Sequence, residues 1–389
     1  MIPYGRQDIS KDDIDAVVSV LQSDFLTQGP KVPEFEGVVC TYTGAKHALA
    51  TNSATSALHI ACLALDVGPG DVVWTSPVTF VASANCARYC GADVDFVDID
   101  PKTYNLSISS LRAKLEQVAI DGGRLPKVVI PVHLCGQPCD MAGLKQLADQ
   151  YGFLIIEDAS HAIGGRYKDS VVGSCEFSDV TVFSFHPVKI VTTAEGGMAV
   201  TNDENVAKRM SLYRSHGVTR DADLMTHEPD GDWYYQQVAL GFNYRMTELQ
   251  AALGISQMAR LDDFVSARHE LAARYDKLLS ALPVITPHQE SFSYSGFHLY
   301  VIQVETEGSG PSHKEIFDSL RSQGVGVNLH YIPVHTQPYY RDLGFARGHY
   351  PVAEEYYSKA ISLPLFHQMT YDQQDEVVAA LKVALKGVG

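Results

Sequence analysis

The sequence lacks any run of 18 or more apolar residues, and its first ten residues contain no apolar core of the kind a signal peptide needs. We therefore expect a cytoplasmic protein without a membrane partner. Positive charge is also scarce, since 30 Lys and Arg stand against 46 Asp and Glu and give a net charge of −16. Nucleic-acid backbones require a basic surface, so we expect no nucleic-acid partner. The negative net charge does not exclude an anionic small molecule as a ligand, because binding one needs only a few local donors.

Cysteine is infrequent, and its spacing is not that of a metal site. The chain has seven cysteines, an odd number, and no CxxC pair. Cys135 and Cys139 are too widely spaced for a zinc knuckle, and no second pair matches them. The pattern favours reduced thiols, and we expect no metal.

Apolar segments that predict strands alternate with segments that predict helices through the first half of the chain. The expected strands lie near 48–51, 71–77, 93–99, 127–133, 153–158, 181–185 and 198–202, and the expected helices at 9–26, 32–42, 58–68, 80–89, 106–118 and 140–149. This alternation predicts a parallel sheet wound with crossover helices, in which ligands bind at the carboxyl ends of the strands.

The second half of the chain predicts a long helix followed by a smaller α+β region. Thr247 and Gln250 form a capping box that opens an amphipathic helix, bent or broken, extending to about Leu282. Beyond it we expect strands at 297–304 and 325–330, a helix at 312–323, and helices near Ala353 and Asp372. The 389 residues suggest two domains. We place an N-terminal arm at 1–14, a large domain at 15–260 and a small C-terminal domain at 261–389.

A single lysine, Lys189, follows the strand predicted at 181–185 and is flanked by Val188 and Ile190. Burial among apolar residues lowers the pKa of a lysine toward values at which the neutral amine is populated. The neutral amine attacks carbonyl carbons, so Lys189 is a candidate imine-forming nucleophile. The alternative is a lysine at a loop edge whose ammonium group stays in water.

Two other polar features lie at places where a ligand would bind. Asp158 ends the strand predicted at 153–158. Thr55 and Ser56 belong to a run of small and hydroxyl side chains that opens a helix, and the free N–H groups of a helix start bind phosphate. For Asp158, the alternative is that it and the neighbouring Glu157 are solvated turn residues. For Thr55 and Ser56, the alternative is an ordinary N-cap.

One cofactor, pyridoxal phosphate, would use these features together. It needs a lysine for its imine, an acidic group at its ring nitrogen, donors for its phosphate and a flat packing surface for its ring. The chain offers a candidate for each need: Lys189, Asp158, the helix start at Thr55 and Ser56 together with Ser184, and Phe80.

Seven motifs occur in order along the chain and are more specific together than singly. They are Leu26-Thr-Gln-Gly29, Asn52-Ser-Ala-Thr-Ser56, Ser76-Pro-Val-Thr-Phe80, Glu157-Asp-Ala-Ser-His161, Ser184-Phe-His-Pro-Val-Lys189, Glu195-Gly-Gly197 and Gly241-Phe-Asn-Tyr-Arg-Met246. With them the chain resembles the DegT/DnrJ/EryC1/StrS sugar aminotransferases over essentially its whole length. Within that family it is most similar to the transaminases of pseudaminic acid biosynthesis, through Thr192-Thr-Ala-Glu-Gly-Gly197, His298-Leu-Tyr300 and Val327-Asn-Leu-His-Tyr-Ile-Pro-Val-His335.

The resemblance implies an α/β, fold-type I, pyridoxal phosphate-dependent aminotransferase with a mostly parallel sheet and a smaller α+β C-terminal domain. It implies that Lys189 carries the imine and moves the substrate proton, that Asp158 pairs with the ring nitrogen, and that His161 lies near the ring hydroxyl. The family often has alanine where this chain has Ser160, so the resemblance does not determine how this residue packs on the second face of the cofactor ring.

Further roles follow from the same resemblance. Phe80 is expected to stack on the ring. The phosphate is expected to bind Thr55, Ser56 and Ser184, joined by Asn243 from the other subunit of a homodimer. Tyr4 and Tyr331 are weaker candidates for lining the sugar pocket, because core or surface packing would equally explain them.

The implied reaction is transamination of a nucleotide-linked 4-keto-6-deoxy sugar with L-glutamate as the amino donor. The expected substrate is UDP-2-acetamido-2,6-dideoxy-4-hexulose, and the expected product is a 4-amino sugar of the pseudaminic acid type. Alternatives are an aminotransferase for a 3-keto or dTDP-linked sugar and a non-catalytic regulatory protein of the same fold. Related dehydratases replace the imine lysine with histidine, whereas this chain retains Lys189.

Overall fold

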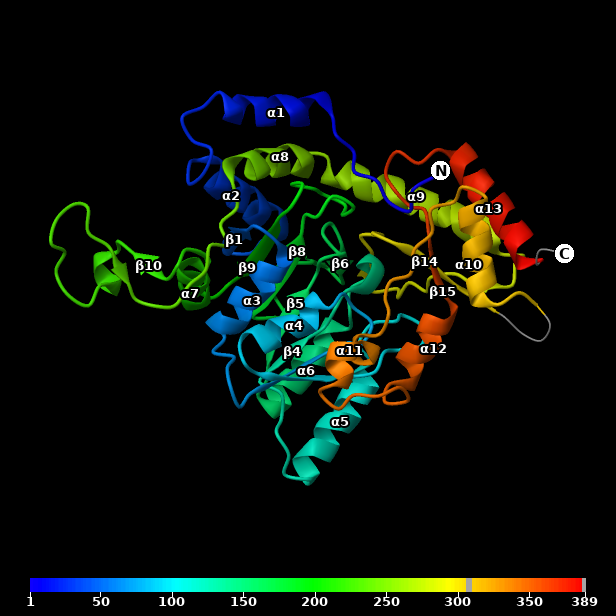
Figure 1. Cartoon of the computed structure of the whole chain (residues 1–389), viewed down its shortest axis with the longest axis horizontal. Helices are drawn as coiled ribbons and strands as arrows, with labels where there is room; N and C mark the ends of the chain where they lie inside the picture. The colour runs from blue at the N-terminus through cyan, green and yellow to red at the C-terminus, as the bar shows by residue number, and fades with distance from the viewer. Residues whose placement is uncertain (306–309, 387–389) are drawn as a thin grey trace.

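The computed structural model, which describes residues 1–305 and 310–386, is built around a seven-stranded sheet (Figure 1). In spatial order the strands are β1 (His47–Thr51), β9 (Gly197–Thr201), β8 (Val180–Ser184), β5 (Leu154–Asp158), β4 (Val128–Ile130), β2 (Val72–Thr75) and β3 (Asp93–Phe96). The pairs from β8 through β3 are parallel, and β9 is antiparallel to both β8 and β1. The predicted mostly parallel α/β sheet is therefore confirmed.

Helices cover both faces of the sheet because successive strand residues face opposite sides. On one face α3 (Ala54–Ala64), α4 (Ala82–Tyr89) and α7 (Glu204–Arg214) enclose a core that contains Val73. On the other face α5 (Ile108–Ile120) and α6 (Met141–Tyr151) enclose a core that contains the next residue, Trp74. Helix α3 ends at Ala64, four residues before the expected stop at Gly68.

Three further helices lie at the β1 and β9 end of the sheet (Figure 1). Helices α2 (Lys31–Thr43) and α8 (Glu248–Met258) pack on a core that contains Ala50 of β1 and Val200 of β9, and α1 (Lys11–Leu21) packs across α8. Helix α1 is capped by Ser10 and is shorter than the helix predicted at 9–26. The Thr247 and Gln250 capping box is present, and the expected break separates α8 from α9 (Leu261–Leu279) at Ala259 and Arg260.

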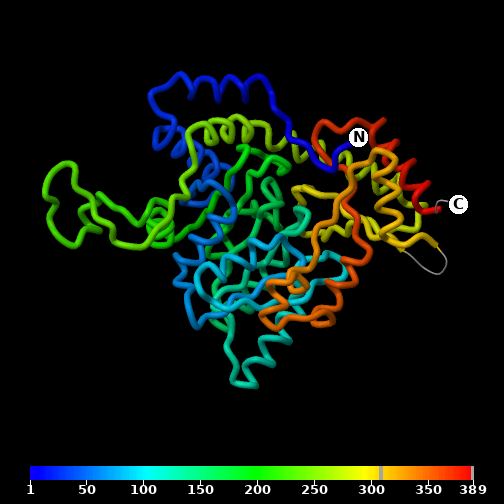
Figure 2. Tube along the Cα trace, in the orientation of Figure 1, coloured from blue at the N-terminus to red at the C-terminus, as the bar shows by residue number. Residues whose placement is uncertain are grey.

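The C-terminal part has a sheet and a core of its own. Its strands β12 (Val284–Ile285), β14 (Tyr300–Val304) and β15 (Ala360–Leu363) are antiparallel and pack with α9, α10 (His313–Ser322) and α13 (Tyr371–Leu385). The N-terminal residues lie against this part, since Ile2 N–H donates to Gly324 O at 2.8 Å (Figure 2). We propose that the domain division follows the boundaries expected from the sequence.

The strand predicted at 325–330 was wrong. Val325 and Val327 are buried as the alternation suggested, but the segment makes only single bridges, from Val325 to Ile2 and from Asn328 to Ser362. The reason is that its two neighbours are different segments, the N-terminus and β15, so no continuous ladder forms on either side.

The remaining elements are short. They are β6 (Arg166–Tyr167), β7 (Ser170–Val171), β10 (Val218–Thr219), β11 (Gln236–Gln237), β13 (Ser293–Tyr294), α11 (Pro338–Arg341), α12 (Pro351–Lys359), and 3₁₀ turns at Leu134–Gly136, Ala222–Leu224 and Val334–Thr336. The segment with β10 and β11 extends away from the body as an arm (Figure 2). Among the helices in the described ranges, none is both long and apolar enough to cross a bilayer.

Candidate active site

A cavity of about 470 Å³ opens at the carboxyl ends of β5 and β8, where a parallel sheet presents ligand sites. Of the ten site residues expected from the sequence, eight line it: Tyr4, Thr55, Phe80, Asp158, His161, Ser184, Lys189 and Tyr331. The other two do not. The Oγ of Ser56 donates to Asn52 Oδ1 at 2.6 Å, and Asn243 is exposed on the segment before α8.

Lys189 lies in a turn just after β8, where its N–H donates to His186 O at 2.9 Å. Burial lowers the pKa of Lys189 to about 8, although the nearby Asp158 carboxylate opposes the shift. The neutral amine is therefore accessible near physiological pH, as an imine-forming lysine requires.

The Asp158 carboxylate is held by two donors at the end of β5. The hydroxyl of Ser83 lies 2.6 Å from Oδ2, and the N–H of Ser160 donates to Oδ1 at 3.1 Å. Asp158 is only 5% exposed. Sequence reasoning missed Ser83, because a serine inside a predicted helix carries no signal that it faces a carboxylate 75 positions away.

The ring of His161 bridges two groups on either side of the cavity. Cys135 N–H donates to its Nδ1 at 3.3 Å, so the proton of the neutral ring is on Nε2, which lies 3.0 Å from the Tyr331 hydroxyl. Burial, with the nearby Lys189 charge, holds the pKa of His161 well below its usual value. His161 is therefore neutral at physiological pH and fixes the position of the Tyr331 hydroxyl.

Three further histidines line the cavity, and two of them, His298 and His330, are buried. Burial and the Lys189 charge lower the pKa of His330 to about 3, and its Nδ1 lies 2.7 Å from Ser362 Oγ. The pKa of His298 is lowered for the same two reasons, and its Nδ1 has no hydrogen-bond partner within the described ranges. Both belong to motifs noted in the sequence, but no pattern there indicated which of their residues face the cavity.

The start of α3 forms the opposite wall. Ser53 caps the helix by accepting from Ser56 N–H at 3.2 Å, and Ala54 and Thr55 at the first turn line the cavity. A Cβ on Gly197 would lie 2.4 Å from Ala54 N, so only glycine lets β9 approach this helix start so closely. The N–H groups of a first helical turn have no acceptor within the helix and are free for an anion.

Phe80 lies at the mouth of the cavity. Its side chain is 58% exposed, and its ring centroid lies 6.3 Å from that of Tyr331. A large aromatic side chain that is exposed at the rim of a cavity is available to pack on a flat ligand.

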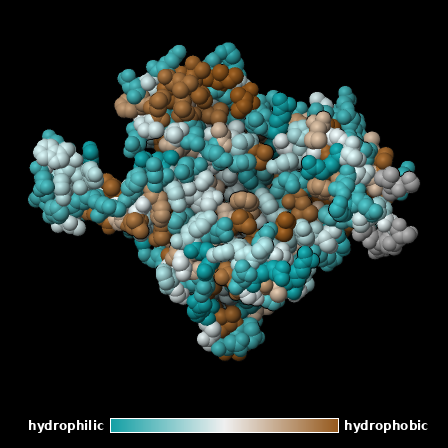
Figure 3. Space-filling model, viewed as in Figure 1, coloured by the Kyte–Doolittle hydropathy of each residue, from teal (hydrophilic) through white to brown (hydrophobic). Residues whose placement is uncertain are grey.

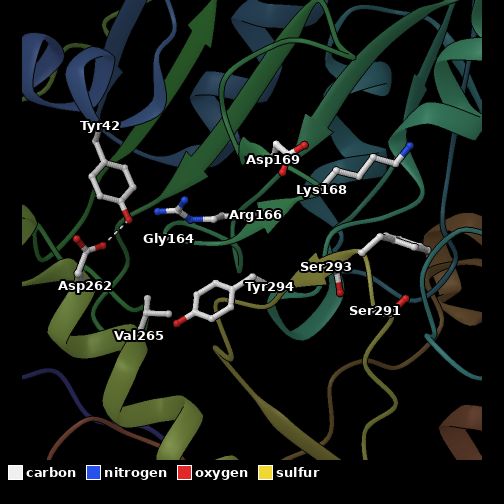
Figure 4. Close-up of a pocket in the computed structure, with 11 residues that line it drawn as sticks. Tyr42, Gly164, Arg166, Lys168, Asp169, Asp262, Val265, Ser291, Ser293 and Tyr294 are labelled. Atoms are coloured by element: carbon white, nitrogen blue, oxygen red, sulfur yellow. Dashed lines mark hydrogen bonds between the residues drawn. The ribbon is translucent and has the colours of Figure 1, made fainter.

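A second, more open hollow of about 630 Å³ lies between α2, α9 and β13. Arg166 points toward Tyr42 there, and Tyr42 donates to Asp262 at 2.8 Å (Figure 4). Its cations, Arg166 and Lys168, are exposed. Because its lining offers no buried lysine, we assign the active site to the smaller cavity.

The donor set of that cavity fits pyridoxal phosphate. The cavity is lined by a lysine with a lowered pKa and by a carboxylate that two donors hold in place. Its opposite wall is a helix start against which a glycine packs closely. These match the imine, ring-nitrogen and phosphate requirements of that cofactor.

The chain is similar to known proteins over nearly its whole length. Residues 7–382 match the model of the DegT/DnrJ/EryC1/StrS aminotransferase family. The spore coat polysaccharide biosynthesis protein SpsC of Bacillus subtilis is 38% identical over 389 residues, covering 99% of this chain and 97% of SpsC.

Solved structures agree with the sequence comparison. Helicobacter pylori PseC, an aminotransferase involved in the biosynthesis of pseudoaminic acid, superposes with a TM-score of 0.90 at 29% identity, covering 99% of each chain. The PLP form of the putative sugar aminotransferase Spr1654 from Streptococcus pneumoniae superposes with a TM-score of 0.87 at 30% identity, covering 98% of each chain. The chain therefore belongs to the DegT/DnrJ/EryC1/StrS aminotransferase family and is a pyridoxal phosphate-dependent aminotransferase.

Proposed function

We propose that this sugar aminotransferase moves an amino group from L-glutamate to the C4 ketone of a nucleotide-linked 4-keto-6-deoxy sugar. The substrate proposed is UDP-2-acetamido-2,6-dideoxy-4-hexulose, and the product is a 4-amino sugar for pseudaminic acid-type biosynthesis. The observation that carries the proposal is the convergence of Lys189, Asp158 and the α3 start on one cavity. The similarity to PseC supports this sugar class, and the name of SpsC supports a role in carbohydrate assembly.

Pyridoxal phosphate, when bound, supplies an electron sink for the carbanion at the carbon that loses and gains the amino group. Asp158 would hold the proton of the ring nitrogen, because the hydrogen bonds from Ser83 and Ser160 keep its carboxylate oriented. Lys189 would hold the cofactor and move a proton to and from the reacting carbon, and a pKa of about 8 suits an amine that must accept and return a proton.

The phosphate would bind at the start of α3, with Thr55 and Ser184 as hydroxyl donors. Ser56 would act indirectly, by stabilising the start of α3, because its hydroxyl already donates to Asn52. Phe80 would cover the ring from the cavity mouth, and the neutral His161 would lie by the ring hydroxyl.

The substrate would occupy the rest of the cavity, beside Tyr4 and Tyr331. The buried His298 Nδ1 has no partner in the described ranges and suits a polar substrate group. His330 is neutral, so the wall of this part of the cavity carries hydroxyl and imidazole groups and suits an uncharged sugar ring better than a phosphate.

The active enzyme is proposed to be a homodimer in which Asn243 reaches the cofactor phosphate of the other subunit. Asn243 is exposed and lies outside the cavity of its own chain. Apolar side chains also cover the outer face of α1 and the turn after it (Figure 3): Ile14, Val18, Leu21, Phe25 and Leu26. An exposed apolar patch of this kind supports a two-fold contact, which would complete both sites at once.

A turnover screen tests the function. Purified protein is mixed with glutamate and a panel of nucleotide keto sugars, comprising UDP- and dTDP-linked 4-keto and 3-keto compounds, and products are identified by mass. The expected result is 4-amination of the UDP-linked N-acetyl sugar. Preferential turnover of a 3-keto or dTDP-linked sugar would reassign the substrate, and a cofactor-loaded protein that turns over none of the panel would favour a regulatory role. Lys189→Ala is the control for uncatalysed amination.

A further inference from the structure

Arg268 of α9 is a buried cation close to the active-site cavity, although it does not itself line that cavity. It is 2% exposed. A buried arginine ordinarily pairs with a carboxylate, because an unpaired charge is costly to remove from water. The arginine ion pairs among the described residues do not include Arg268. Burial lowers the pKa of Arg268 to about 10, so the side chain is still charged at neutral pH and is stabilised by neutral groups.

These neutral groups are three backbone carbonyls of two different segments. Nη1 of Arg268 donates to Phe297 O and to His298 O, each at 3.2 Å, and to Leu365 O at 3.0 Å. Phe297 and His298 precede β14, whereas Leu365 follows β15. Hydrogen bonds from a charged donor are stronger than those between neutral groups. One side chain of α9 therefore ties together the segment that enters the C-terminal sheet and the segment that leaves it.

Each of these two segments is connected to a residue that lines the cavity. His298 lines the cavity directly. The N–H of Leu365 donates to Tyr4 O at 3.1 Å, and Tyr4 lines the cavity as well. The hydrogen bonds of Arg268 thus fix the backbone of His298 and, through Leu365, the backbone of Tyr4.

The backbone just before His298 has a conformation that needs support from its surroundings. The φ angle of Phe297 is 45°, in the left-handed region that residues other than glycine rarely adopt. Such a conformation persists only where the surrounding contacts hold it. Arg268 holds the carbonyl of Phe297, and on the other side a Cβ on Gly136 would lie 2.7 Å from Phe297 N, so the turn at Gly136 packs directly on this backbone. The position of the next residue, His298, depends on these contacts.

We propose that Arg268 is a positioning residue for the sugar substrate, because it holds the backbone that places the side chains of His298 and Tyr4 at the cavity. This inference rests on the proposed function, which puts the sugar beside Tyr4. An arginine suits the task, since its planar guanidinium group offers several donors in a fixed geometry and can bind carbonyls of both segments at once. Its loss should therefore weaken binding of the sugar.

The groups assigned to the cofactor are held by other contacts. The carboxylate of Asp158 is held by Ser83 and Ser160, and the start of α3 is capped by Ser53. A change at Arg268 should therefore leave the affinity for pyridoxal phosphate unchanged. It should also leave unchanged the rate constant of the glutamate half-reaction at saturating glutamate, because that step depends on the groups around the reacting carbon. This separation distinguishes positioning of the substrate from a general loss of structure.

The test compares variants of the cofactor-loaded protein with the keto sugar that the wild-type protein turns over best in the screen. Arg268→Lys keeps the charge but not the planar set of donors, and KM for the sugar should rise about tenfold. The dissociation constant for pyridoxal phosphate and the glutamate half-reaction, both followed by absorbance, should stay within about twofold of wild type. Arg274→Lys is the matched control, since Arg274 lies on the same helix and pairs with Asp375 at 2.8 Å, and it should leave KM unchanged. An unchanged KM in Arg268→Lys, or a parallel loss of cofactor affinity, would overturn the inference.

Variants of the cavity residues keep the test independent of whether the Arg268 variant folds. His298→Ala and Tyr4→Ala retain the carbonyls that Arg268 and Leu365 hold, and each should raise KM for the sugar about tenfold or more with unchanged affinity for pyridoxal phosphate. An unchanged KM in both would overturn the inference, because Arg268 would then position no residue that binds the sugar. A wild-type protein that turns over no sugar of the panel would contradict the proposed function itself, so the wild-type result tells the two failures apart.

Discussion

The hydroxyl of Ser83 lies 2.6 Å from Oδ2 of Asp158, within a hydrogen bond that joins α4 to the end of β5. Thr79 Oγ1 lies 2.7 Å from the same hydroxyl, so Ser83 is itself held in place. Asp158 thus reaches the cavity from a fixed position rather than as a mobile carboxylate, which is the condition for holding a ring proton.

Replacing Ser83 tests this positioning. In Ser83→Ala, Asp158 loses one of its two donors, and kcat should fall about tenfold, equivalent to ~1.4 kcal/mol. The cofactor should remain bound, because the phosphate contacts are elsewhere. Steady-state kinetics and the cofactor absorption spectrum measure the two effects. Ser109→Ala, at an exposed serine of α5, is the control, and equal kcat values for both variants would remove the role of Ser83.

Removing the charge of Asp158 should have a larger effect. In Asp158→Asn the cofactor should still bind, but the ring nitrogen loses the carboxylate that holds its proton, and kcat should fall more than about 100-fold. Single-turnover absorbance with glutamate measures this. If Asp158→Asn kept more than about a tenth of the wild-type kcat, a loss under ~1.4 kcal/mol, Asp158 would not serve as the ring-nitrogen partner.

The lowered pKa of Lys189 predicts its reactivity in the cofactor-free protein. The unprotonated amine is the reactive form, so acetylation of Lys189 by limiting acetic anhydride should rise about tenfold per pH unit below pH 8 and level off above it. Peptide mass spectrometry gives the rate at each pH, with the exposed Lys102 of the same sample as the reference. In the loaded protein, borohydride should attach the cofactor to Lys189, and attachment to any other lysine would contradict the assignment.

The close approach of Gly197 to α3 predicts a change in cofactor affinity. In Gly197→Ala the new Cβ would overlap the backbone of Ser53 and Ala54, and the helix start would have to move away from the phosphate. The dissociation constant for pyridoxal phosphate, measured by absorbance, should rise about tenfold or more, ~1.4 kcal/mol. Gly37→Ala on α2 is the matched control, since its Cβ would meet no atom within 4 Å, and it should leave the affinity unchanged.

Subunit mixing tests the proposed sharing of the active site. Inactive Lys189→Ala is mixed with weakly active Asn243→Ala under conditions of confirmed subunit exchange. If Asn243 acts across the dimer, each heterodimer has one site with both changes and one site with neither, so each heterodimer should have half of the activity of a wild-type dimer. No recovery after exchange would mean that Asn243 acts within its own chain or has no catalytic effect.

Much of the site was predictable because it depends on local order along the chain. A parallel sheet brings the carboxyl ends of its strands to one edge. The positions of Asp158 at the end of β5 and Lys189 just after β8 therefore follow once the strands are recognised. The predicted capping box of Thr247 and Gln250 is local as well, since its two residues lie three positions apart.

The remainder was decided by contacts between residues distant in sequence. Ser83 meets Asp158 across 75 positions, and the backbone of Gly197 meets the α3 start across more than 140. The segment 325–330 has the alternation of a strand, and its Val325 and Val327 are buried, but it lies between two different segments, so the tertiary structure decided that it forms no ladder. A sequence determines the local hydrogen bonds and the apolar faces, whereas the partner that each face meets depends on how the whole chain packs.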